Sequence, residues 1–122
     1  MILGFKTKFT DKILSGTKIH TIRKDSKNRW KVGNTIHFAN GIRTKNYNCF
    51  KIDKCISIQT IKIKYYMGCG NYPLIFIDNR LISNDEFAIL YRKDGFSCAE
   101  SFCEWFNEDF EGKLIHWTDF KY

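Results

Sequence analysis

The chain places an amine, a hydroxyl and a guanidinium close together, at Lys18, Thr21 and Arg23. Thr21 and Arg23 are two residues apart, so on a strand they face the same side. Lys18 and Thr21 are three apart, so they can share a pocket only if the chain kinks between Gly16 and Thr21. Such a group suits a polar or anionic ligand. The alternative is that Lys18 and Arg23 are solvated charges at a strand edge.

Asp94 is a second candidate, because it lies at the C-terminal end of an expected helix, where a negative charge is disfavoured by roughly 0.3–1 kcal/mol. It follows Phe87 by seven residues and so continues the apolar stripe of that helix. A carboxylate that points inward at this end needs a cation, which Lys18 or Arg23 could supply. In the alternative interpretation, Asp94 caps the backbone amides around Ser97 instead.

Short helices are expected in three places. The first, over residues 9–16, has Thr10 as its expected N-cap and Gly16 as the left-handed residue that ends it. The other two helices each open with a Ser-x-x-Glu capping box, which starts at Ser83 in one and at Ser97 in the other. The helices therefore lie near both ends of the chain.

Strands are expected between these helices, at 19–22, 35–39, 50–65, 74–77 and 80–82, and a final strand follows them at 114–118. The apolar alternation of 50–65 changes parity, which predicts a β-bulge near Gln59 and Thr60. Bulged, bent strands are typical of small barrels. We therefore expect a single α+β domain over residues 1–122, with a partly closed β-barrel and flanking short helices.

Charge is unevenly distributed and favours a polyanionic partner. Residues 1–64 carry 15 Lys and Arg against 3 Asp and Glu, whereas residues 65–122 carry 5 against 10. Within the basic half, a cluster around one tryptophan could bind RNA, with cations on the phosphates and the indole stacked on an unpaired base. Its members are Arg23, Lys24, Lys27, Arg29 and Lys31 around Trp30. The alternative is that Trp30 packs over the mouth of the barrel.

Several classes of site are not expected from this composition. The five cysteines form no Cys-x-x-Cys pair and the three histidines are scattered, so we expect reduced thiols and no metal site. Cys69, between two glycines, is expected in an exposed loop. No apolar run approaches the roughly 18 residues of a membrane helix, and the first residues do not resemble a signal peptide. We therefore expect a cytoplasmic protein without a membrane partner or a cofactor.

The early motif resembles the ASCH family, a branch of the PUA-like superfamily. That family's motif is a short helix that ends in glycine, then Lys-x-x-Thr-x-Arg, then an aromatic-Lys-x-Gly turn. This chain supplies Gly16, Lys18, Thr21, Arg23, Trp30, Lys31 and Gly33 in that order. The resemblance extends to residues 94–96 and 115–118, so it covers nearly the whole chain. It implies a PUA-like barrel that binds or acts on RNA or a modified nucleoside.

Some small ASCH proteins are similar to this chain and remove the acetyl group of N4-acetylcytidine with a Lys, a Thr and a Glu. The resemblance assigns the first two roles to Lys18 and Thr21, and the third falls nearest to Asp94, one methylene shorter. In the implied mechanism, Lys18 takes a proton from Thr21 or from a water, and the activated oxygen attacks the amide carbonyl. Asp94 positions Lys18 or protonates the leaving amine, and Arg23 could hold the oxyanion. The same relationship also implies the alternative, an RNA-binding module without catalysis.

Overall fold

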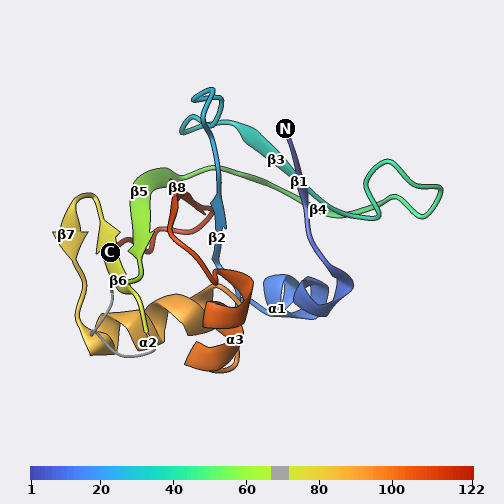
Figure 1. Ribbon diagram of the computed structural model, residues 1–122. Coiled ribbons are helices and arrows are strands. Elements are labelled where there is room, and N and C mark those ends of the chain that lie inside the picture. Colours follow the sequence, from blue (N-terminus) through green and yellow to red (C-terminus); the bar gives the residue numbers. More distant parts are fainter. Residues whose placement is uncertain (67–71) are drawn as a thin grey trace.

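The computed structural model describes residues 1–66 and 72–122, arranged as two sheets with short helices gathered along one end (Figure 1). In chain order, the elements are β1 (Ile2–Gly4), η1 (Thr7–Phe9), α1 (Thr10–Leu14), β2 (His20–Arg23), β3 (Thr35–Asn40), β4 (Asn48–Lys54), β5 (Ser57–Lys64), β6 (Leu74–Ile77), β7 (Arg80–Leu81), α2 (Asn84–Lys93), α3 (Ala99–Trp105) and β8 (Phe110–His116). The expected α+β class is confirmed.

The strands form two separate hydrogen-bonded sheets. The smaller has the order β1-β3-β4, with β1 parallel to β3, and the larger has the antiparallel order β2-β8-β5-β6-β7. Within residues 1–66 and 72–122 these sheets do not close into a barrel, so the closure expected from the sequence is not observed. The larger sheet carries β2, and with it Thr21 and Arg23, at one edge.

The parity change in 50–65 has a different cause from the expected bulge. This segment is two strands, β4 and β5, interrupted at Cys55 and Ile56. The Cys55 N–H donates to Asn34 in the connection before β3, whereas the Ile56 N–H donates to His116 in β8. The apolar face switches here because the chain passes from one sheet to the other. A shift of register instead occurs where β3 pairs with β4: Phe38 lies opposite Lys51 and Ala39 opposite Cys49, so Phe50 of β4 is the extra residue.

The helix ends agree with the sequence in two places. Gly16 has a φ of +83° and follows α1, as expected of a left-handed stop. Before α2, the Ser83 side chain accepts from the Glu86 N–H, and the Glu86 side chain accepts from the Ser83 N–H, so this capping box is confirmed. The cap satisfies two amides that the first turn of a helix leaves unpaired.

The two other expected caps are wrong. The residue before α1 is Phe9, and the Thr10 hydroxyl donates instead to the Asn40 side chain in β3 at 3.2 Å. The residue before α3 is Cys98, one position later than the expected Ser97, and it makes no side-chain capping bond. Tertiary contacts in one case and a one-residue shift in the other replace the local pattern.

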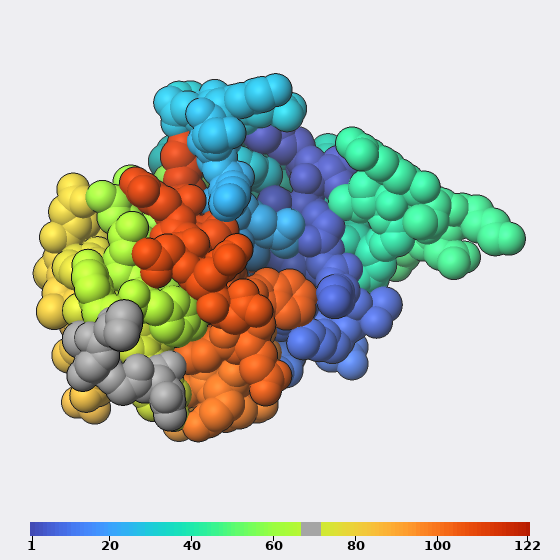
Figure 2. All heavy atoms as spheres, in the orientation of Figure 1, coloured from blue at the N-terminus to red at the C-terminus, as the bar shows by residue number. Residues whose placement is uncertain are grey.

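The core lies where the inner faces of the sheets meet the helices. Its fully buried members are mainly isoleucine, leucine and phenylalanine from the central strands and from α2 and α3, such as Phe38, Ile61, Leu90, Phe102 and Leu114. The loop between β3 and β4, residues 41–47, projects from this body (Figure 2). In this arrangement, the first residues of the chain and β2 lie beside the C-terminal ends of α2 and α3.

Two further observations concern the excluded classes. Among the described residues, no helix combines the length and apolar character required to cross a membrane. Four of the cysteines are free thiols, of which only Cys55 is buried. The loop expected around Cys69 lies outside the described residues.

Candidate functional site

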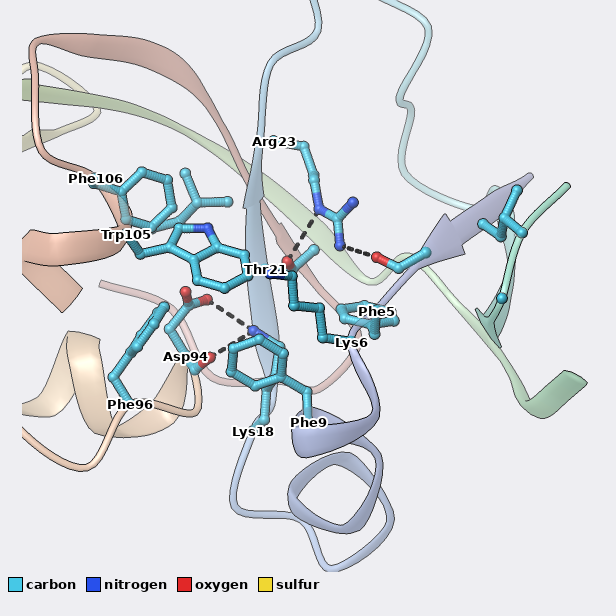
Figure 3. Close-up of a pocket in the computed structure, with 14 residues that line it drawn as sticks. Phe5, Lys6, Phe9, Lys18, Thr21, Arg23, Asp94, Phe96, Trp105 and Phe106 are labelled. Carbon is cyan, nitrogen blue, oxygen red and sulfur yellow. Dashed lines mark hydrogen bonds and ion pairs between the residues drawn. The ribbon is translucent and has the colours of Figure 1, made fainter. Parts of the chain in front are cut away.

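A cavity of about 400 Å³ lies between β1, η1, β2 and the segments that follow α2 and α3 (Figure 3). Small-molecule sites commonly occupy a few hundred Å³ and combine apolar walls with a few polar groups. The aromatic part of the wall is Phe5, Phe9, Phe96, Trp105 and Phe106. The polar part includes the sequence candidates Lys18, Thr21, Arg23 and Asp94. The structure thus brings all four into one cavity.

Lys18 and Thr21 converge because the chain is irregular before β2. The Lys18 N–H donates to the Lys12 carbonyl in α1, and the Ile19 N–H donates to the Lys93 carbonyl in α2, each at 2.9 Å. These bonds hold Lys18 in a connecting segment, and the regular strand begins only at His20. The kink that the spacing required is therefore present.

The Lys18 and Asp94 side chains form a buried pair, only 3% and 4% exposed. The Lys18 Nζ donates to the Asp94 backbone carbonyl at 2.6 Å and lies 3.3 Å from Oδ1 of the carboxylate. The expectation that Asp94 points inward to a cation is confirmed. Burial lowers the pKa of the Lys18 ammonium below its ordinary value, although the Asp94 carboxylate opposes this shift.

Gly95 allows the lysine stem to approach this helix end. It has a φ of +98°, which favours glycine. A Cβ at this position would lie 2.9 Å from the Phe9 ring and 3.1 Å from Cδ of Lys18. The Lys18 Nζ also lies 5.0 Å from the centroid of the Phe9 ring. A side chain at residue 95 would therefore displace the groups that hold the amine.

Arg23 is fixed beside Thr21 at the opposite wall. Its Nε donates to the Thr21 hydroxyl oxygen at 3.3 Å, and one terminal nitrogen donates to the Gly4 carbonyl at 2.6 Å. The guanidinium carbon lies 4.9 Å from the centroid of the Phe5 ring. Burial lowers the pKa of Arg23, but a guanidinium remains protonated in proteins. It therefore supplies a fixed positive charge next to the hydroxyl.

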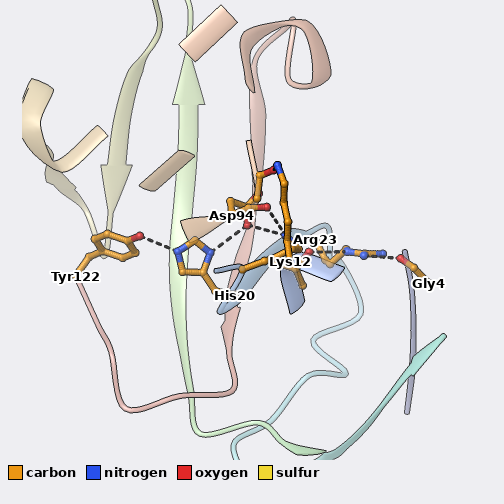
Figure 4. Close-up of polar contacts among 9 residues, drawn as sticks. Gly4, Lys12, His20, Arg23, Asp94 and Tyr122 are labelled. Carbon is orange, nitrogen blue, oxygen red and sulfur yellow. Dashed lines mark hydrogen bonds and ion pairs between the residues drawn. The ribbon is translucent and has the colours of Figure 1, made fainter. Parts of the chain in front are cut away.

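His20 is a member of this site that the sequence reasoning missed (Figure 4). Its Nδ1 lies 3.0 Å from Oδ1 of Asp94, and its Nε2 lies 2.7 Å from the Tyr122 hydroxyl. Its spacing gave no signal, because Lys18 lies before the regular strand and the parity of β2 therefore does not relate the two side chains. The histidines were judged only as metal ligands and therefore dismissed as scattered.

Trp105 is a second residue that was missed. Its side chain lines the cavity and the residue is 43% exposed. The Nζ atoms of Lys6 and Lys8 each lie 5.0 Å from the centroid of a Trp105 ring. An exposed indole beside two cations has the features that we expected around Trp30.

The cluster around Trp30 has a different arrangement from the expected one. Trp30 is only 7% exposed and packs in the core, so its ring is not presented to a base. Lys24, Arg29 and Lys31 are exposed on the loop between β2 and β3, and none of them lines the cavity. Of the Lys and Arg residues between positions 18 and 31, only Lys18 and Arg23 line the cavity.

The site shows no arrangement suited to a metal ion. In the part of the chain that the structure describes, no three His, Cys, Asp or Glu side chains are grouped to hold one.

Compared with known proteins, the chain matches no family model, no curated protein and no solved structure.

Proposed function

We propose that this protein hydrolyses an acyl amide on a nucleobase, of the N4-acetylcytidine type, in the cavity described above. The observation that carries the proposal is a buried lysine amine in the same aromatic-walled cavity as a threonine hydroxyl, with a fixed arginine bonded to that hydroxyl. The ASCH resemblance of the same residues supports the choice of substrate.

Lys18 is the proposed base. A neutral amine has two N–H groups, and both can donate to Asp94, one to its backbone carbonyl at 2.6 Å and one to its carboxylate at 3.3 Å. The nitrogen lone pair then remains free to accept a proton from Thr21. Burial favours this neutral form, because it lowers the pKa of the Lys18 ammonium.

Arg23 supports the developing negative charge. Its hydrogen bond to the Thr21 oxygen becomes stronger as that oxygen loses its proton, because a charged donor then meets a charged acceptor. After attack, the same guanidinium lies beside the tetrahedral centre formed on Thr21. A fixed donor at this point stabilises the transition state more than the ground state.

The reaction proceeds in two steps. The Thr21 oxygen forms a bond to the acyl carbon, the carbon–nitrogen bond breaks, and the Lys18 ammonium passes its proton to the leaving amine of the base. Lys18 then takes a proton from a water, the water oxygen bonds to the acyl carbon, and the bond between that carbon and the Thr21 oxygen breaks. The Lys18 ammonium returns its proton to the Thr21 oxygen, and the acyl group leaves as the free carboxylic acid. Asp94 holds Lys18 throughout both steps.

The walls of the cavity suit a planar base. Phe9, Phe96 and Trp105 supply aromatic surface, whereas the amine, hydroxyl and guanidinium lie at the inner side (Figure 3). Pockets that bind small molecules use this combination, in which apolar area provides affinity and few polar groups fix orientation. A base bearing a small acyl amide could then present its carbonyl to Thr21.

The proposal is tested by incubating purified protein with N4-acetylcytidine and following cytidine release. Lys18→Met and Thr21→Val should each lower kcat/KM by about a thousandfold or more, because each removes a group needed in the transition state. As a control, Lys27→Met changes an exposed lysine on the loop between β2 and β3, which does not line the cavity, and this variant should keep full activity. Equal rates in the wild type and both cavity variants would refute the scheme.

The covalent route can be tested separately. In the wild type quenched during turnover, mass spectrometry should find an acyl group on the peptide that contains Thr21. Its absence, with kcat/KM still lost in Lys18→Met, would instead assign the attack to a water activated by Lys18.

An RNA-binding module without catalysis is the second candidate, and the exposed Trp105 beside Lys6 and Lys8 favours it. In this case single-stranded RNA should bind with an affinity that falls steeply with salt. Trp105→Ala should weaken binding by roughly 1–3 kcal/mol, the usual value of one stacked base. An affinity that is flat from low to moderate salt would contradict this function.

A further inference from the structure

A line of buried hydrogen bonds leads away from the cavity, from Asp94 through His20 to Tyr122 (Figure 4). His20 is fully buried on β2 and does not line the cavity. Its ring lies behind the pair formed by Lys18 and Asp94. The mechanism proposed above makes no use of it, so its role requires its own explanation.

The direction of these hydrogen bonds follows from chemistry. An ionised carboxylate only accepts, so the Nδ1 of His20 must carry the hydrogen that lies on Asp94 at 3.0 Å. Burial lowers the pKa of His20, so the ring is neutral and its Nε2 is an acceptor. The Tyr122 hydroxyl therefore donates to Nε2 at 2.7 Å.

Tyr122 is itself held in place, by Gln59 on β5. Its N–H donates to the Gln59 side-chain oxygen at 3.0 Å, and its carbonyl accepts from the Gln59 side-chain nitrogen at 2.9 Å. The same Gln59 oxygen lies 3.0 Å from Nε2 of His116 on β8. The hydroxyl that orients His20 is thus anchored on the central strands of the larger sheet.

One atom of Asp94 serves two partners. Its Oδ1 lies 3.3 Å from the Lys18 Nζ and 3.0 Å from the His20 Nδ1. Donation from His20 withdraws negative charge from this oxygen and so weakens its attraction for a proton on Lys18. It also restricts rotation of the carboxylate, so that the same oxygen stays within reach of the amine.

We propose that His20 is a positioning residue, which orients Asp94 and thereby favours the neutral form of the Lys18 amine. This role rests on the proposed hydrolase function, because the neutral amine is the base in that scheme. His20 acts through Asp94 and touches neither the substrate nor Thr21. The series of contacts from Tyr122 through His20 and Asp94 to Lys18 therefore sets the proton affinity of the base.

Other charged groups also face this pair and must stay constant in any test. Lys12 on α1 and Arg23 on β2 act on Lys18, and His116 on β8 packs edge-on against His20, with ring centroids 5.3 Å apart. Asp78 and Lys121 act on His116 in turn. Substitution of His20 alone leaves all of these groups in place.

The experiment compares two substitutions of His20. His20→Leu removes both hydrogen bonds, whereas His20→Asn keeps an N–H near the position of Nδ1 and so can still donate to Asp94. The titration of Lys18 is followed by NMR in protein with isotope-labelled lysine, assigned with Lys18→Met. His20→Leu should raise the pKa of Lys18 by about one unit, and His20→Asn should stay near the wild type, because only the former removes a hydrogen bond to the carboxylate.

In the hydrolysis assay, the acidic limb of the pH profile of kcat/KM should move upward with the same variant and by the same amount. Wild-type titration of Lys18 in His20→Leu, or an equal shift in both variants, would overturn the proposal, since a steric role alone predicts no difference between donor and non-donor. If the leucine variant does not fold, His20→Gln replaces it, because its amide superposes on Nε2 and faces Tyr122; it must then show the upward shift. The NMR titration needs no turnover, so failure of the hydrolase function and failure of this coupling are told apart.

Discussion

Asp94 and Asp25 have side chains with the same small exposed fraction, yet the chain uses them differently. Each side chain is only 4% exposed and each is paired with a lysine, Lys18 for Asp94 and Lys113 for Asp25. Asp25 accepts from the backbone N–H groups of Arg29 and Trp30 and from Lys113, all at 2.8–2.9 Å. Among residues 1–66 and 72–122, the donors to the Asp94 carboxylate are two side chains, Lys18 and His20, and both can titrate.

The consequence is a difference in which proton can move. Burial alone would raise the pKa of Asp25, but its hydrogen bonds from Lys113 and two backbone amides lower it to about 2. That carboxylate is permanently charged and organises the loop between β2 and β3. In the pair formed by Asp94 and Lys18, the group whose pKa burial shifts is the lysine, and that pKa is lowered. Burial of an ion pair therefore marks a functional site only where the partners are titratable and line a cavity.

The largest expected effect on stability is at Asp94. Asp94→Ala should lower the free energy of unfolding by about 3 kcal/mol, because it removes the carboxylate that faces Lys18 and His20. The buried lysine then keeps only the backbone carbonyl of residue 94, and the His20 Nδ1 loses its acceptor. The double variant Lys18→Met/Asp94→Ala should recover part of this loss, since the methionine needs no partner. Urea unfolding of the single and double variants measures the coupling. Additive losses would show that the pair is not a unit.

A smaller loss is expected at Asp25, with no loss of hydrolysis. Asp25→Ala should cost about 2 kcal/mol, because three donors lose an acceptor, but the freed loop amides and Lys113 can reach water. Cytidine release should be unchanged, because Asp25 does not line the cavity. Asp25→Asn keeps an acceptor oxygen, so its free energy of unfolding should lie between those of the wild type and Asp25→Ala. A loss of kcat/KM as large as that expected of Lys18→Met would erase the distinction between the two carboxylates.

The pH dependence of stability should separate the two regions. Burial lowers the pKa of His116, which packs against His20, from 6.5 to about 4. Between these values the unfolded chain binds more protons than the folded one, so stability falls as the pH falls from about 6.5 to 4, by up to about 3 kcal/mol. The contribution of Asp25 is present above pH 3.8 and is lost below it, down to about pH 2.

Urea unfolding at half-unit pH steps checks this order. His116→Gln should reduce the fall in stability in the upper window, where His20 still contributes, and Asp25→Asn should reduce it in the lower one. A wild-type stability that is flat from pH 6.5 to 4 would contradict the burial of a neutral histidine behind the site.

Much of the cavity could be predicted from the sequence, because its polar groups lie close together or at a helix end. The spacing of Lys18, Thr21 and Arg23 required a kink, and the position of Asp94 required a cation, and the structure contains both. The elements themselves were largely found, because alternation and turn residues act locally.

The missed features depend on contacts between distant segments. The partner that orients His20 is Tyr122, and neither residue type nor spacing relates the two. Trp105 was passed over and Trp30 alone was considered for stacking, with packing as its alternative, because the sequence shows which residues are aromatic but not which face solvent. The division of 50–65 between two sheets likewise depends on which strands β4 and β5 pair with. Local patterns carry no information on such pairings.

The two Ser-x-x-Glu segments repeat the comparison at the smallest scale, because the same pattern makes the cap in only one of them. Ser83→Ala should lower the free energy of unfolding by about 1 kcal/mol, since its hydroxyl accepts from the first turn of α2. Ser97→Ala should change it by a few tenths at most, because Ser97 is exposed and α3 follows Cys98 instead. Thermal unfolding of the two variants against the wild type measures the difference. Equal losses would show that α3 begins one residue earlier than the structure has it, and that the pattern alone had been sufficient.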